Sequence, residues 1–334
     1  MISKPNISLP RGVRDILPEE AEKARYVEDA IISVFEKNNF RRVITPMLEY
    51  LDVLLLGLGA ELKDKIFKFV EPASGKIVAI RPDITPQIAR LVAARMKDYP
   101  LPLKLCYNEN LIRYEEPLGG TPVELLQIGA EYIGENSPKA DAEVISTAIE
   151  ALKRVKVRGF KIDIGHIGFF KGLLEDIKVN KSVEKNIRQA VLIKDSSSLN
   201  EILASVKDKK DSDSKGVLAE LPSMFGGKEV IDRVKPHVKA ESAKKALDDI
   251  IKVTTILKKR KLEQYVTIDL GEVRGFDYYT GIIFEGFSKG VGKALLRGGR
   301  YDNLLGKYGY PCPATGFAID IESVVAAIKN DYRP

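Results

Sequence analysis

The sequence predicts an α+β domain that carries a helical insertion. Alternating apolar segments typical of strands occur in the first half and again in the last quarter of the chain, with amphipathic helical patterns between them. In contrast, residues 168–260 are helical in pattern, rich in lysine and interrupted by polar loops. We therefore assign residues 1–167 and 261–334 to a core domain with a mostly antiparallel sheet, and 168–260 to an inserted, mainly helical subdomain.

The composition is typical of a globular protein. The chain has 334 residues, 44% hydrophobic and 30% charged. It has no apolar run near the ~18 residues of a membrane helix and no apolar signal segment at its start. Cys106 and Cys312 are too few for a disulfide framework, and neither the cysteines nor the two histidines form a metal-ligand pattern. We expect a cytoplasmic protein that has no metal, no cofactor and no contact with membranes.

The net charge of +6 raises the question of a nucleic-acid partner. Lysine and arginine are spread along the whole chain and interleaved with acids, and the densest basic run, 257–261, follows an acidic helical segment. No RNA-recognition pattern with interleaved aromatic residues is present. We therefore interpret the basic residues as solvated helix faces and expect no nucleic-acid partner.

The first elements are two helices and a hairpin. Residues 18–38 repeat apolar side chains every three or four positions, which predicts a helix. Residues 40–50 are extended, but Pro46 cannot donate to a ladder, which indicates an edge or interface strand. Residues 65–83 read as a hairpin around an Ala-Ser-Gly turn. A second helix follows, for which we predict Thr85 as the N-cap.

The remaining elements alternate between strands and helices. We predict two antiparallel strands in 103–117 and 123–134, then a capped helix over 137–155 and a strand over 159–166. After the insertion, strands return and a final strand runs into a helix. We interpret "GVGKAL", 290–295, as a glycine hairpin turn, because the spacing of a phosphate-binding loop is absent.

Three segments hold more polar residues and glycine than a core requires: 81–90, 112–134 and 272–305. Within the second, Gln127 and Glu131 are four positions apart and so share one face of an extended strand. Taken alone, Asp83, Gln127 and Glu131 fit a solvated strand or helix position better than a site, and the tyrosines fit ordinary half-buried positions better. Together, however, these segments supply the residue types that one polar ligand requires.

The chemistry of these residue types fits a polar amino acid. Acids on one strand face can hold an ammonium group or an imidazole N–H. Arg274 can hold a carboxylate in a bidentate fork. Tyr278 and Tyr279 can wall a flat ring and offer hydroxyl groups. Histidine is a reasonable candidate for the ligand.

The order of the motifs resembles the catalytic core of histidyl-tRNA synthetase, a class II aminoacyl-tRNA synthetase. "FRRVITPMLEY", "IRYEEP…LLQIGAEYIG" and "ATGFAIDIES" are similar to the three class II motifs, and "VRGFDYYTG" is similar to the family's histidine-specific segment. The resemblance runs from residue 9 to the last helix. It implies a class II synthetase-like antiparallel sheet flanked by helices, and a self-dimer in which Pro46 of the first motif lies at the interface.

The resemblance also implies a pocket for free histidine. The family's pocket residues fall on Asp83, Thr85, Arg113, Gln127, Glu131, Arg274, Tyr278, Tyr279 and Tyr301. The family usually has glutamate at the position of Asp83, so the side chain here is one methylene shorter.

The ATP half of the site departs from the family. Glu116 and Thr121 stand where arginines are expected, Asp320 replaces a glycine, and Ser323 replaces the arginine that binds the triphosphate. Adenylate formation needs cations around the α-phosphate. The resemblance therefore implies a degenerate ATP site, no catalytic residue and no independent aminoacylation. The alternative is that Asp320 and Ser323 are neutral changes beside a site that lies elsewhere.

The sequence ends eleven residues after Ser323, so we expect no anticodon-binding domain. A kept pocket, an altered ATP site and this length together resemble the ATP phosphoribosyltransferase regulatory subunits, whose version of "RPDITPQIAR" is also closer than that of the synthetases. That resemblance implies a noncatalytic partner of the short-form catalytic subunit in a hetero-octamer. The partner activates the catalytic subunit and confers feedback inhibition by histidine in the first step of histidine biosynthesis.

Two other functions fit the same residues. One is a truncated histidyl-tRNA synthetase-like enzyme that still forms histidyl adenylate. The other is a histidine sensor for a different partner. The sequence does not decide which residues contact a catalytic subunit, or whether feedback histidine binds this pocket or a subunit interface.

Overall fold

A curved sheet forms the centre of the molecule in the computed structural model, which describes residues 7–114, 123–206, 213–275 and 277–328. Within these residues nine strands join in the order β1-β5-β6-β12-β11-β10-β7-β9-β8. Their bounds are β1 Arg41–Arg42, β5 Leu103–Ile112, β6 Glu124–Ile133, β12 Ala314–Asp320, β11 Leu296–Arg300, β10 Ile282–Phe287, β7 Lys161–His166, β9 Val266–Asp269 and β8 Phe225–Gly226. The β1–β5 and β7–β9 pairs are parallel and the other neighbours are antiparallel, which confirms the predicted sheet type.

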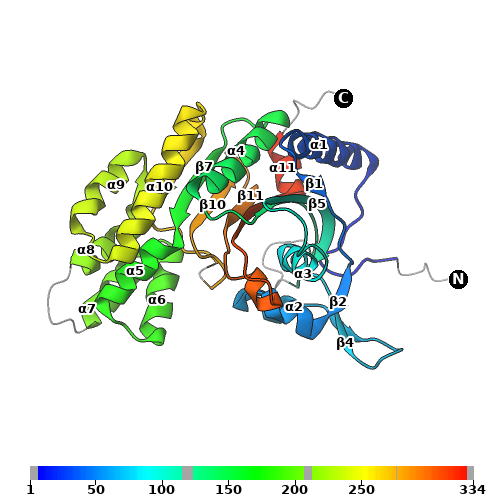
Figure 1. Cartoon of the computed structure of the whole chain (residues 1–334), viewed down its shortest axis with the longest axis horizontal. Coiled ribbons are helices and arrows are strands. Elements are labelled where there is room, and N and C mark those ends of the chain that lie inside the picture. The colour runs from blue at the N-terminus through cyan, green and yellow to red at the C-terminus, as the bar shows by residue number, and fades with distance from the viewer. Residues whose placement is uncertain (1–6, 115–122, 207–212, 276, 329–334) are drawn as a thin grey trace, which may run out of the picture.

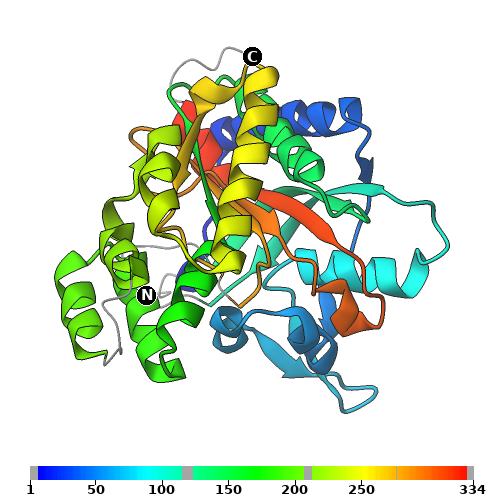
Figure 2. The same cartoon turned by 60° about the vertical axis from the view of Figure 1, so that its left-hand side comes forward.

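One face of this sheet is covered by helices (Figures 1 and 2). They are α1 Pro18–Lys37, α4 Pro138–Arg154, α10 Glu241–Lys259 and α11 Ile321–Ile328. Side chains alternate along a strand, so Ile128, Ala130 and Tyr132 of β6 point into this helical layer and belong to the main hydrophobic core. Ser137 caps α4 as predicted, because its Oγ accepts the Ala140 N–H at 3.2 Å.

A second, smaller layer lies against the other face. It contains α2 Leu51–Gly57, α3 Thr85–Arg95 and a three-stranded sheet of β2 Leu48–Tyr50, β4 Ile77–Ile80 and β3 Lys68–Val70, in that order. The β3–β4 pair confirms the predicted hairpin. Pro46 lies between β1 and β2, which are both edge strands of their sheets, as its sequence position predicts.

The prediction that Thr85 is the N-cap of its helix was wrong. The helix α3 begins at Thr85, and Ile84 occupies the cap position without a side-chain cap. The Thr85 hydroxyl instead donates to Glu131 on β6, and Asp83 accepts the Ile84 N–H at 2.8 Å. The hydroxyl group therefore donates to a distant carboxyl group instead of accepting a local backbone N–H.

Helices α5 to α9 lie together on one side of the sheet and precede α10, which packs along it (Figures 1 and 2). Their bounds are α5 Ile167–Ile177, α6 Lys181–Leu192, α7 Ser196–Ser205, α8 Asp213–Glu220 and α9 Lys228–Val234, and the short 3-10 turns are η1 Ala60–Lys65, η2 Leu221–Ser223, η3 Lys235–His237, η4 Glu263–Tyr265 and η5 Leu305–Tyr308. Residues 168–260 thus contain helices, but they also supply strand β8 and share the main hydrophobic core. Their division from the core domain stays a prediction. None of the described helices combines the length and apolar character that crossing a membrane requires.

The buried Arg81 joins the two sheets. It follows β4, is 2% exposed, and its Nη2 lies 2.8 Å from the Glu109 carboxylate on β5. The same guanidinium donates to the Thr45 carbonyl at 2.9 Å and the Asn110 carbonyl at 2.6 Å. One side chain therefore satisfies groups on β5 and on the segment that leads into β2.

We predict that Arg81→Ala lowers the free energy of unfolding by about 3–5 kcal/mol, because it leaves a carboxylate and two carbonyls without their partner. Urea unfolding measures the change. The matched control is Arg25→Ala, which removes an exposed pair with Asp29 on α1 and should cost less than about 0.5 kcal/mol. A loss at Arg81 as small as that of the control would contradict the assignment.

Candidate functional site

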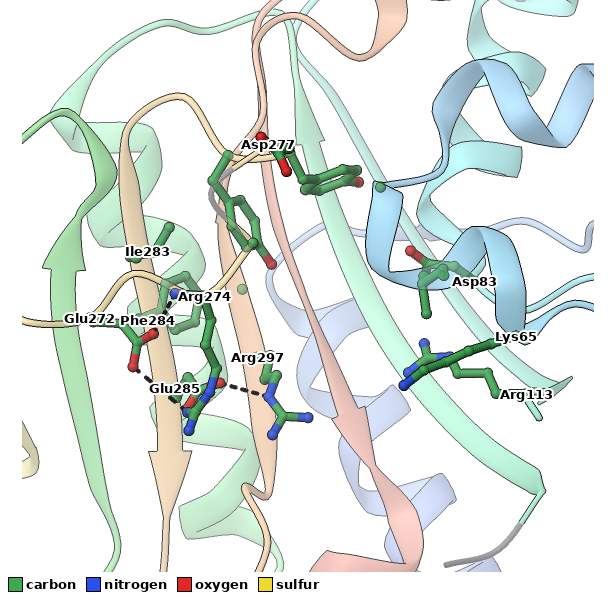
Figure 3. Close-up of a pocket in the computed structure, with 16 residues that line it drawn as sticks. Lys65, Asp83, Arg113, Glu272, Arg274, Asp277, Ile283, Phe284, Glu285 and Arg297 are labelled. Carbon is green, nitrogen blue, oxygen red and sulfur yellow. Dashed lines mark hydrogen bonds and ion pairs between the residues drawn. The ribbon is translucent and has the colours of Figure 1, made fainter. Parts of the chain in front are cut away.

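A pocket of about 490 Å³ lies on the face of the sheet opposite the helical layer. Its floor comes from β6, β12 and β11, and its rim from residues near α3 and from the loop between β9 and β10. An adjoining pocket of about 360 Å³ continues from it (Figure 3). The two pockets share six residues: Asp83, Arg113, Arg274, Tyr278, Tyr279 and Arg297.

The register of the sheet places the polar floor residues in adjacent rows. Gln127 pairs with Asp320 across β6 and β12, and Glu131 pairs with Gly316. Gln127 and Glu131 both line the pocket, so the prediction that they share one strand face is confirmed.

Two glycines let large side chains lie flat on this floor. A Cβ on Gly316 would stand 1.7 Å from Glu131 Oε2, and one on Gly129 would stand 2.2 Å from the Tyr107 ring. These distances are far inside van der Waals contact, so any other residue would push the neighbouring side chain off the sheet. The glycines fix where the carboxyl group of Glu131 can lie.

The carboxyl group of Glu131 is the most enclosed acid in the pocket, with 1% of the residue exposed. The Thr85 hydroxyl donates to Oε1 at 2.8 Å, and the Tyr301 hydroxyl donates to Oε2. Burial raises the pKa of Glu131 to about 8, although both hydroxyl groups act to lower it. A cationic group that entered the pocket would favour the ionised form.

Asp83 provides a second acid on the pocket wall. Burial raises its pKa, against the nearby charge of Arg113 and the backbone N–H groups of Ile84 and Thr85. Two carboxyl groups, neither of which ionises easily alone, therefore face the same cavity. This end of the pocket suits an ammonium group.

Tyrosine rings form an aromatic wall beside these acids. The Tyr278 and Tyr279 rings meet edge to face with centroids 5.1 Å apart, and Tyr278 lies 5.5 Å from Tyr301. Within the described structure, Tyr278 Oη and Gln127 Oε1 are buried without a hydrogen-bond partner. Unsatisfied buried atoms that line a cavity are available to a ligand.

Arg274 lies on the opposite side from Asp83 and is held by acids of the protein (Figure 3). Its guanidinium contacts the Glu285 carboxylate, and its Nη1 lies 3.8 Å from Glu272. Arg297 Nε donates to the other Glu285 oxygen at 2.6 Å. Burial, followed by the charge of Glu285, raises the pKa of Glu272 to about 7. A ligand carboxylate that uses Arg274 has to compete with Glu285.

Lys65, Asp83 and Arg113 face this cluster across the smaller pocket (Figure 3). Arg113 Nε donates to the Pro82 carbonyl at 2.5 Å, which holds its side chain against the segment that precedes α3. The structure therefore brings together all nine residues predicted for histidine binding along the larger pocket. Their role in binding stays a prediction.

The residues predicted for a degenerate ATP site are placed less uniformly. Asp320 lines the larger pocket, and its Oδ1 accepts the Ser323 N–H at 2.7 Å, so it caps α11. Ser323 is buried and lines neither pocket. Glu116 and Thr121 lie outside the described residues. The assignment of these four positions to an ATP site stays a prediction.

Sequence reasoning missed the charged residues on the later strands. Glu285, Arg297, Glu272 and Lys293 all line one of the two pockets. Glu285 could have been found from the sequence, because it is a lone acid within the apolar segment that forms β10. Lys293 belongs to the turn that joins β10 to β11, which confirms the predicted hairpin turn. No described residues form a cluster of three or more potential metal ligands.

Comparison with known proteins identifies the family. A profile of the histidyl-tRNA synthetase family matches residues 12–324. The ATP phosphoribosyltransferase regulatory subunit of Geobacter sulfurreducens is 45% identical over 322 residues, which are 96% of this chain and 73% of that protein. This chain belongs to the family of ATP phosphoribosyltransferase regulatory subunits. The family predicted from the sequence motifs is therefore confirmed.

Solved structures agree with this regulatory-subunit family. The Bacillus halodurans structure described as an ATP phosphoribosyltransferase regulatory subunit/histidyl-tRNA synthetase has a TM-score of 0.89 and 35% identity, over 98% of this chain and 85% of that one. Histidyl-tRNA synthetase from Nostoc has a TM-score of 0.80 at 22% identity, over 98% and 77%, and shows the fold alone. The predicted class II synthetase-like α+β fold is confirmed.

The raised pKa of Glu131 predicts a specific pH dependence of stability. Between about pH 4.5 and 8 the folded protein keeps a proton that the unfolded chain releases, so wild-type stability falls as pH rises through this window. Glu131→Gln removes this pH-dependent contribution to the free energy of unfolding, because glutamine does not titrate. We expect the stability of the variant relative to wild type to rise by roughly 1 kcal/mol per pH unit up to about pH 8 and then level off.

Urea unfolding at pH 5, 6.5, 8 and 9 measures this difference. Glu124→Gln is the control, because Glu124 lies on the same strand but is exposed. A Glu131→Gln profile parallel to wild type over the whole range would rule out a proton held by Glu131.

Proposed function

We propose that this chain is a noncatalytic regulatory subunit that activates the short-form catalytic subunit of ATP phosphoribosyltransferase and makes it sensitive to histidine. This role lies in the first step of histidine biosynthesis. The observation that carries the proposal is the charge arrangement of the pocket. Two enclosed acids, Asp83 and Glu131, stand on one side, an arginine stands on the other, and tyrosine rings line the wall between them.

This arrangement matches the groups of free histidine. The α-ammonium group suits Glu131 and Asp83, since its positive charge would favour the ionised carboxylates that burial disfavours. The α-carboxylate suits Arg274, which is 45% exposed and can form a bidentate fork. Gln127 Oε1 and Tyr278 Oη, both buried, can bond the imidazole nitrogens.

Regulation requires that histidine binding in the pocket changes the activity of a second chain. A coupling free energy of about 1–3 kcal/mol between the two is sufficient for feedback inhibition. We propose that the partner is the short-form catalytic subunit in a hetero-octamer.

The noncatalytic part of the proposal rests on the third motif. Asp320 projects a carboxylate into the pocket where the synthetase family has a glycine. Four cations, Arg113, Arg274, Lys293 and Arg297, are among the described lining residues, so the pocket keeps positive charge. Two of them, however, are already engaged by Glu285. A direct test of adenylate formation is therefore part of the experiment.

We expect this chain to activate a short-form catalytic subunit from the same genome, and histidine to inhibit only when the chain is present. Arg274→Ala should weaken histidine binding about 10- to 100-fold, because one charge-assisted contact is lost. The same variant should raise the histidine concentration needed for inhibition by a similar factor. Phosphoribosyltransferase rates and calorimetric titration measure the two effects, and Arg25→Ala on α1 is the control.

Three outcomes would change the assignment. Histidine-dependent exchange of pyrophosphate into ATP would favour a truncated synthetase-like enzyme. Histidine binding without any effect on the catalytic subunit would favour a sensor for another partner. Inhibition that survives Arg274→Ala unchanged would move the regulatory site to a subunit interface.

We also propose that the chain forms a self-dimer through the first class II motif. Pro46 is exposed, and several large hydrophobic side chains in this part of the chain are exposed as well. They come from the segment between β1 and β2 and from the small sheet: Ile44, Met47, Leu48, Phe67 and Phe69. Ile44 alone is 73% exposed. Such a patch is unusual on a monomer and suits an isologous interface.

Ile44→Asp should therefore convert the dimer to a monomer without loss of folding, since the residue makes little contact within its own chain. Sedimentation equilibrium measures the mass, and circular dichroism checks the fold. Phe225→Asp is the matched control, because Phe225 is 62% exposed but lies on the distant strand β8. A wild-type mass that Ile44→Asp leaves unchanged would contradict the interface.

A further inference from the structure

The loop between β9 and β10, described at residues 270–275 and 277–281, carries Arg274, Tyr278 and Tyr279, and we call these described residues the Arg274 loop. Its first residues are attached to the helical region. The Leu270 N–H donates to the Met224 carbonyl at 3.0 Å. A Cβ on Gly271 would stand 2.5 Å from the Leu221 carbonyl oxygen, so the two backbones are in close contact.

Helix α6 of the helical region also reaches both ends of this loop. Lys194, two residues beyond α6, donates to both carboxylate oxygens of Asp269 at 2.8 and 3.1 Å, directly before the loop. Arg188 within α6 lies 3.4 Å from Asp277 near the other end of the loop. Asp269 is 8% exposed, whereas the Lys194 side chain is about half-buried, so this ion pair lies at the edge of the solvent. Arg274 lies between the two ion pairs.

The middle of the Arg274 loop is held by its own turn and by the pocket. The Tyr278 and Tyr279 N–H groups both donate to the Gly275 carbonyl at 2.9 Å. Gly275 has a φ of +62° and lies so close to the Tyr279 ring that a Cβ would stand 2.6 Å from it. The two tyrosines are therefore hydrogen-bonded to the residue directly after Arg274, and Asp277 lies at the pocket rim beside them (Figure 3).

These contacts make the position of the loop and the position of α6 interdependent. If a ligand carboxylate draws Arg274 away from Glu285 and the backbone of the turn moves with the side chain, that movement strains contacts that tie both ends of the turn to α6 and Lys194. The turn can follow the ligand only if α6 moves with it or the ion pairs break. Binding energy at the pocket is thus shared with the helical region, and such coupling is reciprocal.

We infer that α6 and the residues that follow it position the Arg274 loop through Arg188 and Lys194, so that occupancy of the pocket and the position of the helical region are coupled. This inference rests on the proposed binding of histidine. Arg188 and Lys194 are positioning residues, because they act through Asp277 and Asp269. Lys185 on the exposed face of α6 does not pair with Asp269 or Asp277, so it does not position the Arg274 loop.

Calorimetric titration of the full chain with histidine tests the inference. Arg188→Ala and Asp277→Ala should each weaken binding about two- to fivefold, which is the range of a partly exposed ion pair. The double variant should be no weaker than either single variant. The exchanged pair, Arg188→Asp with Asp277→Arg, should restore most of the affinity. Lys194→Met should lower affinity at least as much as Arg188→Ala.

Lys185→Ala on the exposed face of α6 is the control and should bind as wild type does. Hydrogen exchange supplies a second readout. Histidine should slow exchange of α6 amides in the wild type and in the exchanged pair, but not in Arg188→Ala. Loss of packing alone would not be reversed by exchanging the charges.

Wild-type binding together with unchanged affinities in all variants would overturn the positioning role and leave the proposed function standing. Equal weakening in the single variants and the exchanged pair would also overturn it. No histidine binding by the wild type would overturn both the proposed function and this inference.

Discussion

The site depends on the close approach of the Glu131 side chain to the backbone of the next strand. Because Gly316 has no side chain, the carboxyl group lies flat on the sheet, within reach of both Thr85 and Tyr301. That contact ties the start of α3 and the end of β11 to the middle of β6. The buried acid therefore adds a polar link between walls that also share a small hydrophobic cluster, and its burial raises the pKa of the acid.

The central sheet faces a polar pocket on one side and a hydrophobic core on the other, because side chains alternate along each strand. The odd-numbered positions of β6 supply the polar floor, while Ile128 and Ala130 enter the hydrophobic core beneath the helices. A slip of one residue would bury the acids in that core and expose its apolar residues. The register across β6 and β12 thus couples stability to site geometry, and substitutions on either face are felt on the other.

Much of this architecture could be predicted from sequence, since periodicity and turn residues report local structure. The shared face of Gln127 and Glu131 is such a case. The predictions that failed depend on contacts between residues that are far apart in the sequence. Thr85 looked like a helix cap because its acceptor on β6 cannot be seen locally. The pairing of Arg297 with Glu285 required the strand register. Ser323 looked like a site residue by position, yet the helix turns it away from both pockets.

The contact between Arg274 and Glu285 means that a carboxylate of the protein competes with any ligand carboxylate for Arg274. With no ligand bound, Glu285 occupies the arginine as an internal carboxylate whose effective concentration is fixed by the fold. An external carboxylate gains only the difference between the two contacts. Such internal competition raises the ligand concentration at which the pocket is half filled, by a factor set by the strength of the contact with Glu285. When a ligand carboxylate takes Arg274, Arg297 still pairs with Glu285. The buried Glu285 carboxylate therefore keeps a cationic partner.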